Sequence, residues 1–260
     1  MERRPTMITG ILILCSLLSS YLIVRQEAKI NEPEIVLANV AESIVSLEDA
    51  SGQGRGTGFV VLAKSGERVI ITNAHVCEIN LVAPIFMVFG RQGESLRSPY
   101  RFPVVAIKKD DAHDLCIVSV PPDLKVKPLR LADKAVIDSH IYIIGYPIVA
   151  LLSSSDGFIR GYKLMVEPYE KPLEMCVGKK HYIKTVPIKH KNGKIVPTKI
   201  CFFKARFMFT DALGDHGQSG SPGLNGDGEV VGVMSMIDGQ ARPFAFLVPL
   251  SSLKEFLSTY

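Results

Sequence analysis

The sequence predicts an all-β domain that begins near Ile35 and runs to the last residue. From Ile35 onward, short apolar runs are separated by clusters of Gly, Asp, Asn and Pro, a pattern typical of strands joined by tight turns. Residues 225–228 read Asn-Gly-Asp-Gly, which favours a hairpin turn between two strands. Residues 250–260 instead carry apolar side chains at helical spacing, so we expect a C-terminal helix capped by Ser251 and Ser252.

The N-terminal residues form a separate unit. Residues 7–24 are 18 positions without a charged side chain, preceded by Arg3 and Arg4. That length suits a transmembrane helix and is long for the core of a signal peptide. We therefore expect residues 1–25 to be a signal anchor that leaves the body outside the cytoplasm. Secretion after cleavage of this segment is the alternative, and residues 26–34 form a polar tether in either case.

The body divides into two groups of strands. Residues 51–58 are glycine-rich and predict a tight turn, and residues 121–134 contain three prolines and predict a linker. The first group therefore covers about residues 35–122 and the second about residues 135–249. The expected strands are residues 43–47, 59–62, 68–72, 85–89, 102–108, 115–120, 141–146, 207–210, 229–236 and 244–248, with strand ends at 157–161.

Residues 217–222 read Gly-Gln-Ser-Gly-Ser-Pro and place Ser219 between two glycines. Such a turn can present a hydroxyl group and aim backbone N–H groups at a point beside it, as a nucleophile with an oxyanion hole requires. Taken alone, the stretch is more often a polar loop. A catalytic interpretation needs a base and an orienting acid elsewhere in the chain.

Two upstream residues can supply those groups. His75 follows directly after the strand 68–72, and Asp114 is the last carboxylate before the apolar strand 115–120. A single histidine is more often structural than catalytic. A carboxylate at the edge of a buried strand needs a hydrogen-bond partner, and a histidine N–H is a natural one. Asp110 and Asp111 fit a loop of solvated acids better than Asp114 does.

The short sequence motifs around these residues resemble those of trypsin-like serine proteases. The chain reads Thr-Asn-Ala-His-Val at 72–76, Asp-Leu-Cys-Ile-Val at 114–118 and Thr-Asp-Ala at 210–212, then the Ser219 turn and Gly-Glu-Val-Val-Gly-Val at 228–233. The order His, Asp, Ser along the chain is the chymotrypsin-like order, and the motifs around the three residues are most similar to those of the HtrA/DegP branch. The resemblance implies two six-stranded antiparallel β-barrels. Because the sequence ends at Tyr260, we expect no PDZ domain after them.

The resemblance also implies roles for individual residues. Ser219 would be the nucleophile, His75 the general base and Asp114 the group that orients the imidazole. The N–H groups of Gly217 and Ser219 would form the oxyanion hole. The primary specificity pocket would be lined by Leu213, Gly214, Met234, Ser235 and Met236. No acid occupies these positions, so we expect small to medium apolar P1 side chains rather than Arg or Lys. The resemblance further implies a polypeptide substrate and no metal or cofactor.

Three departures from the family pattern leave other functions open. Ser221 replaces a glycine, Gln218 replaces Asp or Asn, and the approach Gly214-Asp215-His216 is unusual. The extra side chain at Ser221 is expected to crowd the turn. An inactive trypsin-like binding or scaffold protein is therefore one alternative to a serine endopeptidase. An esterase is another, although it would place histidine last in the chain and a glycine at position 221.

Residues 163–206 form an insertion longer than the family needs, with 10 Lys and one Arg against three Glu. Its local charge of +8 exceeds the net charge of the whole chain, which is +4. A net charge of +4 is too small to indicate nucleic acid binding. Asn192-Gly193 predicts its hairpin tip. The insertion fits a solvated hairpin, or a flap that contacts anionic lipid or an acidic substrate. Cys176 and Cys201 are candidates to staple it, but Cys77, Cys116 and these two fit free thiols equally well.

Overall fold

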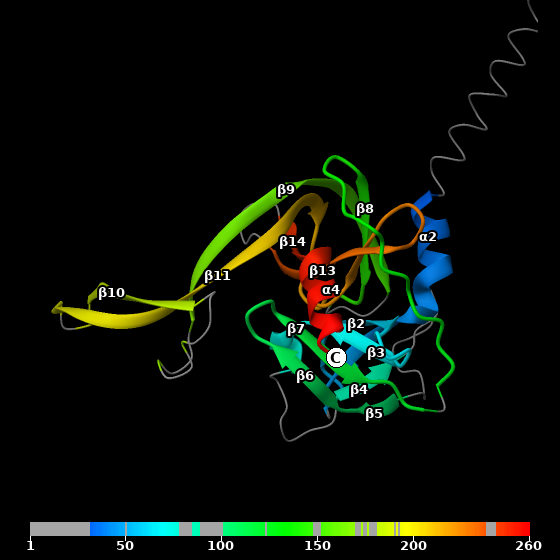
Figure 1. The fold of residues 1–260 in the computed structure, drawn as a ribbon, viewed down its shortest axis with the longest axis horizontal. Helices are drawn as coiled ribbons and strands as arrows, with labels where there is room; N and C mark the ends of the chain where they lie inside the picture. The colour runs from blue at the N-terminus through cyan, green and yellow to red at the C-terminus, as the bar shows by residue number, and fades with distance from the viewer. Residues whose placement is uncertain are drawn as a thin grey trace, which may run out of the picture.

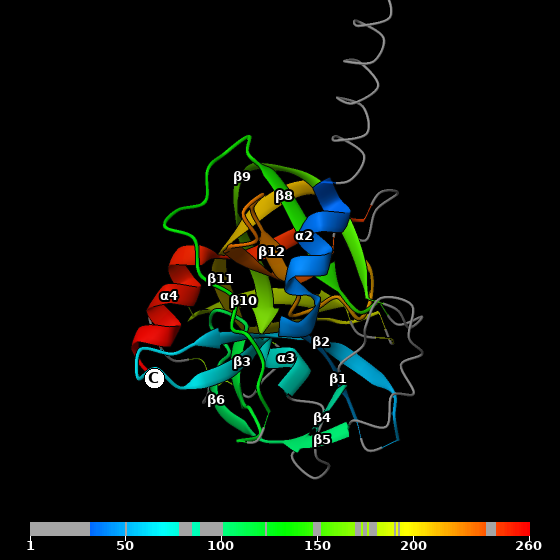
Figure 2. The same ribbon diagram turned by 90° about the vertical axis from the view of Figure 1, so that its right-hand side faces the viewer.

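A computed structural model of the chain shows two antiparallel β-sheets, one above the other, flanked by short helices (Figures 1 and 2). The all-β prediction is confirmed. The structure describes residues 32–49, 51–77, 85–88, 101–122, 124–147, 152–169, 173, 176, 181–189, 191, 193–237 and 243–260. The predicted anchor, residues 1–25, lies outside the described residues. Within the described part of the chain, no helix combines the length and the hydropathy needed to cross a membrane.

The N-terminal sheet holds seven strands in the order β5-β4-β1-β2-β3-β7-β6. They are β1 (Ile44–Glu48), β2 (Gly54–Leu62), β3 (Arg68–Thr72), β4 (Ile85–Val88), β5 (Arg101–Val104), β6 (Ala106–Asp110) and β7 (Leu115–Ser119). Residues 102–108 were expected to form one strand, but the strand breaks at Val105. The Val105 N–H donates to the Ser119 hydroxyl at 2.9 Å, in place of a backbone ladder bond. Because β5 and β6 stand at opposite edges, this one residue links the two edges of the sheet.

The C-terminal sheet closes on itself. Its strands are β8 (His140–Gly145), β9 (Ser153–Tyr169), β10 (His181–Lys189), β11 (Ile195–Leu213), β12 (Pro222–Leu224), β13 (Val230–Ile237) and β14 (Phe244–Pro249). A pairing between β9 and β11 joins the ends of the order β11-β14-β13-β12-β8-β9, which makes a closed six-stranded barrel. The predicted second barrel is therefore present, whereas among the described residues no ladder closes the first sheet between β5 and β6.

Three further local expectations were wrong. Residues 54–58 lie within β2 rather than in a turn, because Gly56 and Gly58 leave the space that Val76 and Ile70 side chains fill across the strand. Helix α2 (Glu32–Val40) begins inside the expected tether. Helix α4 (Leu250–Ser258) starts after Pro249, and no side chain caps it, so Ser251 and Ser252 already lie within the helix.

The two sheets share one hydrophobic cluster. Phe59, Ile71 and Ile117 of the N-terminal sheet are fully buried in it with Phe207 and Val233 of the barrel. Burying one such side chain stabilises the fold by about 1.5–3 kcal/mol. Because residues of both sheets pack in this cluster, the two sheets are held against each other. Loops from both sheets therefore meet beside the cluster.

Candidate active site

His75 sits in the one-turn helix α3 (Ala74–Cys77) that follows β3. Two buried polar residues fix the entry to this turn. The Thr72 hydroxyl donates to the Thr57 carbonyl oxygen at 2.7 Å, and the Asn73 amide donates to the Asp114 carbonyl oxygen at 2.9 Å. The His75 side chain remains about half exposed. The histidine at the end of β3 therefore has an exposed side chain, while hydrogen bonds of the two preceding residues hold its backbone in place.

Asp114 closes the turn before β7 and faces His75. Its carboxylate accepts the His75 backbone N–H at 3.1 Å, and its two oxygens lie 2.9 and 3.0 Å from the His75 Nδ1. Asp114 has φ of 54°, in the left-handed region that non-glycine residues rarely adopt. Such a conformation costs about 1–3 kcal/mol. The contacts of its carboxylate hold the residue in that conformation.

Ser219 lies in a tight turn between the barrel strands. Gly217 and Gly220 have φ of 91° and 86°, which glycine adopts without strain. A Cβ at Gly220 would stand 2.0 Å from the Thr57 carbonyl oxygen, so no larger residue fits there. The Thr57 N–H donates to the Ser219 carbonyl oxygen at 2.7 Å. These contacts attach the turn to β2 of the opposite sheet.

Ser235 connects the predicted nucleophile to the predicted acid. Its hydroxyl donates to Asp114 Oδ2 at 2.5 Å, and its carbonyl oxygen lies 3.4 Å from the Ser219 Oγ. The structure thus brings His75, Asp114 and Ser219 into one cluster, although they are far apart in the sequence and come from both sheets. Within the described residues, neither the Gly217 N–H nor the Ser219 N–H donates a hydrogen bond. Both N–H groups can therefore donate hydrogen bonds to a charged oxygen beside the turn.

The structure accommodates the two departures in the turn. Ser221 is fully buried, and its hydroxyl occupies the space in front of Gly145, where an added Cβ would stand 1.8 Å from it. The expected crowding is therefore avoided because Gly145 has no side chain. The Ser221 Oγ has no hydrogen-bond partner among the described residues. Gln218 is buried too, and its Oε1 accepts the Asp215 N–H at 2.9 Å, which ties down the unusual approach to the turn.

The five predicted pocket residues differ in exposure. Leu213 is half exposed at the end of β11, while Met234 and Ser235 are buried in β13 and Met236 is partly buried. Gly214 is buried as well, because the ends of the Met234 and Ile237 side chains occupy the space beside its Cα. The surroundings of this glycine are therefore apolar.

A second histidine–carboxylate contact supports the Asp114 turn. Asp110 accepts the N–H groups of Ala112 and His113 at 2.9 and 3.2 Å, and its Oδ2 lies 2.5 Å from the His113 Nδ1. Burial alone would raise the pKa of Asp110, but the hydrogen bonds and the charge of His113 outweigh it and lower that pKa. Asp110 is thus a structural acid rather than the solvated one the sequence suggested.

Two disulfides are present. Cys77 pairs with Cys116 and Cys176 with Cys201. Cys77 lies two residues after His75, and Cys116 lies two residues after Asp114. The first bond therefore joins the turn that carries His75 to the strand that follows Asp114.

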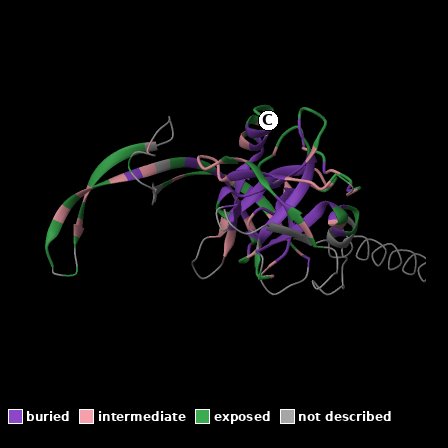
Figure 3. Cartoon of the chain, turned by 90° about the horizontal axis from the view of Figure 1, so that it is seen from below, coloured by how far each residue is buried: buried purple, intermediate pink, exposed green. Residues whose placement is uncertain are grey.

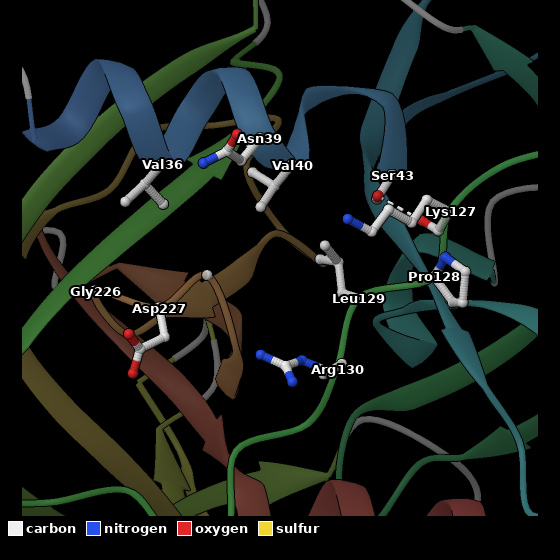
Figure 4. A pocket seen from close by; sticks show the side chains of 11 residues that line it. Val36, Asn39, Val40, Ser43, Lys127, Pro128, Leu129, Arg130, Gly226 and Asp227 are labelled. Atoms are coloured by element: carbon white, nitrogen blue, oxygen red, sulfur yellow. Dashed lines mark hydrogen bonds between the residues drawn. The ribbon is translucent and has the colours of Figure 1, made fainter.

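Two of the cavities next to the described residues differ in their relation to the predicted site. One, of about 360 Å³, lies beside Gly217 and is lined by an ion pair between the buried Glu48 and the exposed Arg101, 2.8 Å apart. Burial raises the pKa of Glu48, although the charge of Arg101 opposes the shift. The other, of about 690 Å³, lies between α2, the linker residues 127–130 and the 226–228 turn (Figure 4), and none of the predicted site residues lines it. Among the described residues, no three His, Cys, Asp or Glu side chains are grouped to hold a metal ion.

Thr57, Thr72 and Asn73 are the site residues that sequence reasoning missed. Besides its two backbone contacts, Thr57 donates its hydroxyl to the Gly217 carbonyl oxygen at 2.9 Å and accepts the Tyr146 N–H at the same distance. One threonine thus holds the turn of one sheet against a strand of the other. Thr72 and Asn73 belong to the Thr-Asn-Ala-His-Val motif. Their role in holding the backbone before His75 follows only from the structure, in which both are fully buried.

Comparisons with known proteins show the family of this fold. The model of the trypsin-like peptidase domain matches residues 56–233. The chain is 25% identical over 250 residues to the serine protease HTR4 of Rattus norvegicus and 23% identical over 248 residues to the serine protease HTRA4 of Mus musculus. Each alignment covers 91% of this chain and 42% of the relative, so the chain spans less than half the length of these relatives.

Solved structures share the fold. The Rv3671c protease of M. tuberculosis in its active form superposes with a TM-score of 0.58 at 20% identity, over 86% of this chain and 82% of that one. The serine endoprotease of Yersinia pestis gives 0.57 at 17% identity, over 87% and 66%. Since the domain match covers well over half of the sequence, the chain belongs to the trypsin-like peptidase family, with relatives of the HtrA type.

Proposed function

We propose that the chain is a serine endopeptidase that uses Ser219, His75 and Asp114. The observation that carries the proposal is the Asp114 carboxylate, which contacts the His75 ring on one side and the Ser235 hydroxyl on the other. Ser235 in turn contacts Ser219. These contacts join the half-exposed His75 to the Ser219 turn through the Asp114 carboxylate and Ser235.

The chemistry follows from these positions. Asp114 accepts the Nδ1–H of His75 and so leaves Nε2 as the base that takes the Ser219 proton. The Ser219 oxygen attacks the substrate carbonyl carbon, and the resulting oxyanion accepts hydrogen bonds from the N–H groups of Gly217 and Ser219. His75 then donates its proton to the leaving amine, and water hydrolyses the acyl-enzyme by the same steps. In this resting state the Ser219 hydroxyl points to the Ser235 carbonyl oxygen, so substrate binding must turn it toward His75.

The apolar surroundings of Gly214 support a preference for apolar P1 side chains. A peptide library with all twenty P1 residues tests this preference and the reaction together. Hydrolysis that is lost in Ser219→Ala and concentrated after apolar P1 residues agrees with the proposal. Cleavage mainly after Arg or Lys contradicts the pocket assignment, and equal hydrolysis by Ser219→Ala contradicts the nucleophile.

The proposed location is outside the cytoplasm, with residues 1–25 as anchor. The two disulfides support it, since such bonds persist in oxidising compartments. Alkylating the thiols of the chain in intact cells, before reduction, tests the location. Four protected cysteines are expected, and four alkylated ones would contradict it.

A further inference from the structure

The basic insertion forms a protruding tongue, defined here as the described residues between 163 and 206. β11 pairs on one side with the outer part of β9 and on the other with β10. Figure 1 shows this part of the sheet extending away from both sheets of the body, and Figure 3 shows it largely exposed. The nine-residue strand β10 alone spans about 30 Å. The predicted hairpin is confirmed, with Gly193 at its tip at φ of 80°.

The register of the tongue gathers apolar side chains on one face. Directly paired residues of an antiparallel ladder share a face, so Tyr182 lies beside Phe202 and Ile188 beside Val196. None of the apolar residues of this face is buried, and none belongs to the hydrophobic clusters of the body. We call this set the apolar face of the tongue; it consists of Leu164, Val166, Tyr182, Val186, Ile188, Val196, Ile200 and Phe202.

Positively charged side chains lie on the same face of the tongue. Lys184, Lys204 and Arg206 lie on it by the same register, and all three are exposed. From residue 176 to residue 210 the sequence contains eight Lys, one Arg and no Asp or Glu. Since the whole chain has a charge of +4, the rest of the chain is acidic. The positive charge is therefore concentrated on the protruding element.

We propose that the apolar face of the tongue docks on a membrane surface that contains anionic lipid. Apolar and aromatic side chains enter the boundary between headgroups and acyl chains, while the stems of Lys and Arg let their charges stay with the headgroups. Charge alone would suit any polyanion, but eight solvent-accessible apolar residues on the charged face favour a lipid surface over nucleic acid or an acidic chain. The uncharged run at residues 7–24 agrees with a position at a membrane. Docking would hold the protease body at a fixed height above the bilayer.

The chain offers a direct reporter because it contains no Trp. Tyr182→Trp places a single tryptophan on the apolar face, and Leu62→Trp places one on an exposed site of the body in a separate control protein. Each full chain is reconstituted with nanodiscs of phosphatidylcholine, with or without phosphatidylserine. We expect a blue shift and quenching by brominated lipid only for the Tyr182→Trp reporter, only with phosphatidylserine, and reversed by salt.

Matched charge variants separate docking from general attraction. Replacing Lys184, Lys204 and Arg206 by Gln is expected to weaken docking on the order of 100-fold. Replacing the exposed Lys64, Lys125 and Lys134 by Gln removes the same charge from the body and is expected to leave docking unchanged. Unchanged emission of the Tyr182→Trp reporter with phosphatidylserine would overturn the proposal. So would equal losses in the two triple variants, or a response to polyglutamate or single-stranded DNA but not to lipid.

Discussion

The disulfide between Cys77 and Cys116 gives the most specific prediction about the site. In Cys77→Ala/Cys116→Ala, the turn that bears His75 loses its covalent link to the strand that follows Asp114. The matched control is Cys176→Ala/Cys201→Ala, which removes the other disulfide from the tongue. The two variants differ in where a crosslink is lost, not in the kind of bond.

The expected losses of stability are similar. The sequence separations are 39 and 25 residues, and the loop-entropy relation gives about 4 and about 3.5 kcal/mol for them. The expected losses of activity differ. With the bond gone, the His75 turn keeps the packing of Val76 and hydrogen bonds such as the one from Asn73 to Asp114, but it loses its covalent link to β7. A displacement of about 1 Å at a reacting group costs about 100-fold in rate, so we expect the first variant to react with a fluorophosphonate 10- to 100-fold more slowly.

The assay is the second-order rate of fluorophosphonate labelling at a temperature where circular dichroism shows both variants folded. Urea unfolding of the same samples gives the stability of each. A slower reaction in the first variant alone agrees with a disulfide that positions His75. Equal rates in the two variants, at similar stability, would refute this role and leave the Cys77–Cys116 bond as a general crosslink.

Three further predictions concern single contacts of the site. Gly145→Ala should destabilise the fold because its Cβ would meet the Ser221 hydroxyl, and Ser221→Gly should relieve that loss, with a coupling above about 1 kcal/mol in urea unfolding; additive effects would contradict the packing. Ser235→Ala removes a hydrogen bond to Asp114 and should lower kcat about tenfold with little change in KM; an unchanged kcat would contradict the bridging role. Asp110→Asn should lower the free energy of unfolding by about 1 kcal/mol at pH 7. Since the pKa of Asp110 is lowered in the folded state, this difference should begin to shrink as the pH falls below the unfolded pKa of about 3.9 and should be lost as the pH falls through the lower folded-state pKa; a difference that does not shrink below the unfolded pKa would contradict it.

The sequence predicted the parts of the molecule that depend on local pattern. Most strand positions followed from alternation and turn residues, and the closed barrel followed from the family resemblance. The order of His75, Asp114 and Ser219, with the words around them, was enough to expect these residues at one site. Local reasoning failed where a distant partner decides the structure. Gly56 and Gly58 look like turn residues until Val76 and Ile70 are seen beside them.

Other features required the packed fold. Nothing in the local sequence indicates that Ser221 fits because Gly145 lies opposite, 76 residues away in the chain. Thr57 is one threonine in a glycine-rich run, and only the approach of the second sheet gives its hydroxyl two partners. The cysteine pairing stayed open for the same reason, because disulfide geometry is set by the positions of the backbone.

The central claim is that Ser219 is a nucleophile activated by His75, and labelling with a fluorophosphonate tests it most directly. Wild type, Ser219→Ala, His75→Ala and the nearby control Ser221→Ala are treated with the probe, and the modified residue is identified by mass spectrometry. We expect one adduct on Ser219 in wild type and in Ser221→Ala, and loss of labelling by a factor on the order of 10⁴ or more in the other two. No adduct on folded wild type, or an adduct that forms equally fast in His75→Ala, would contradict the claim.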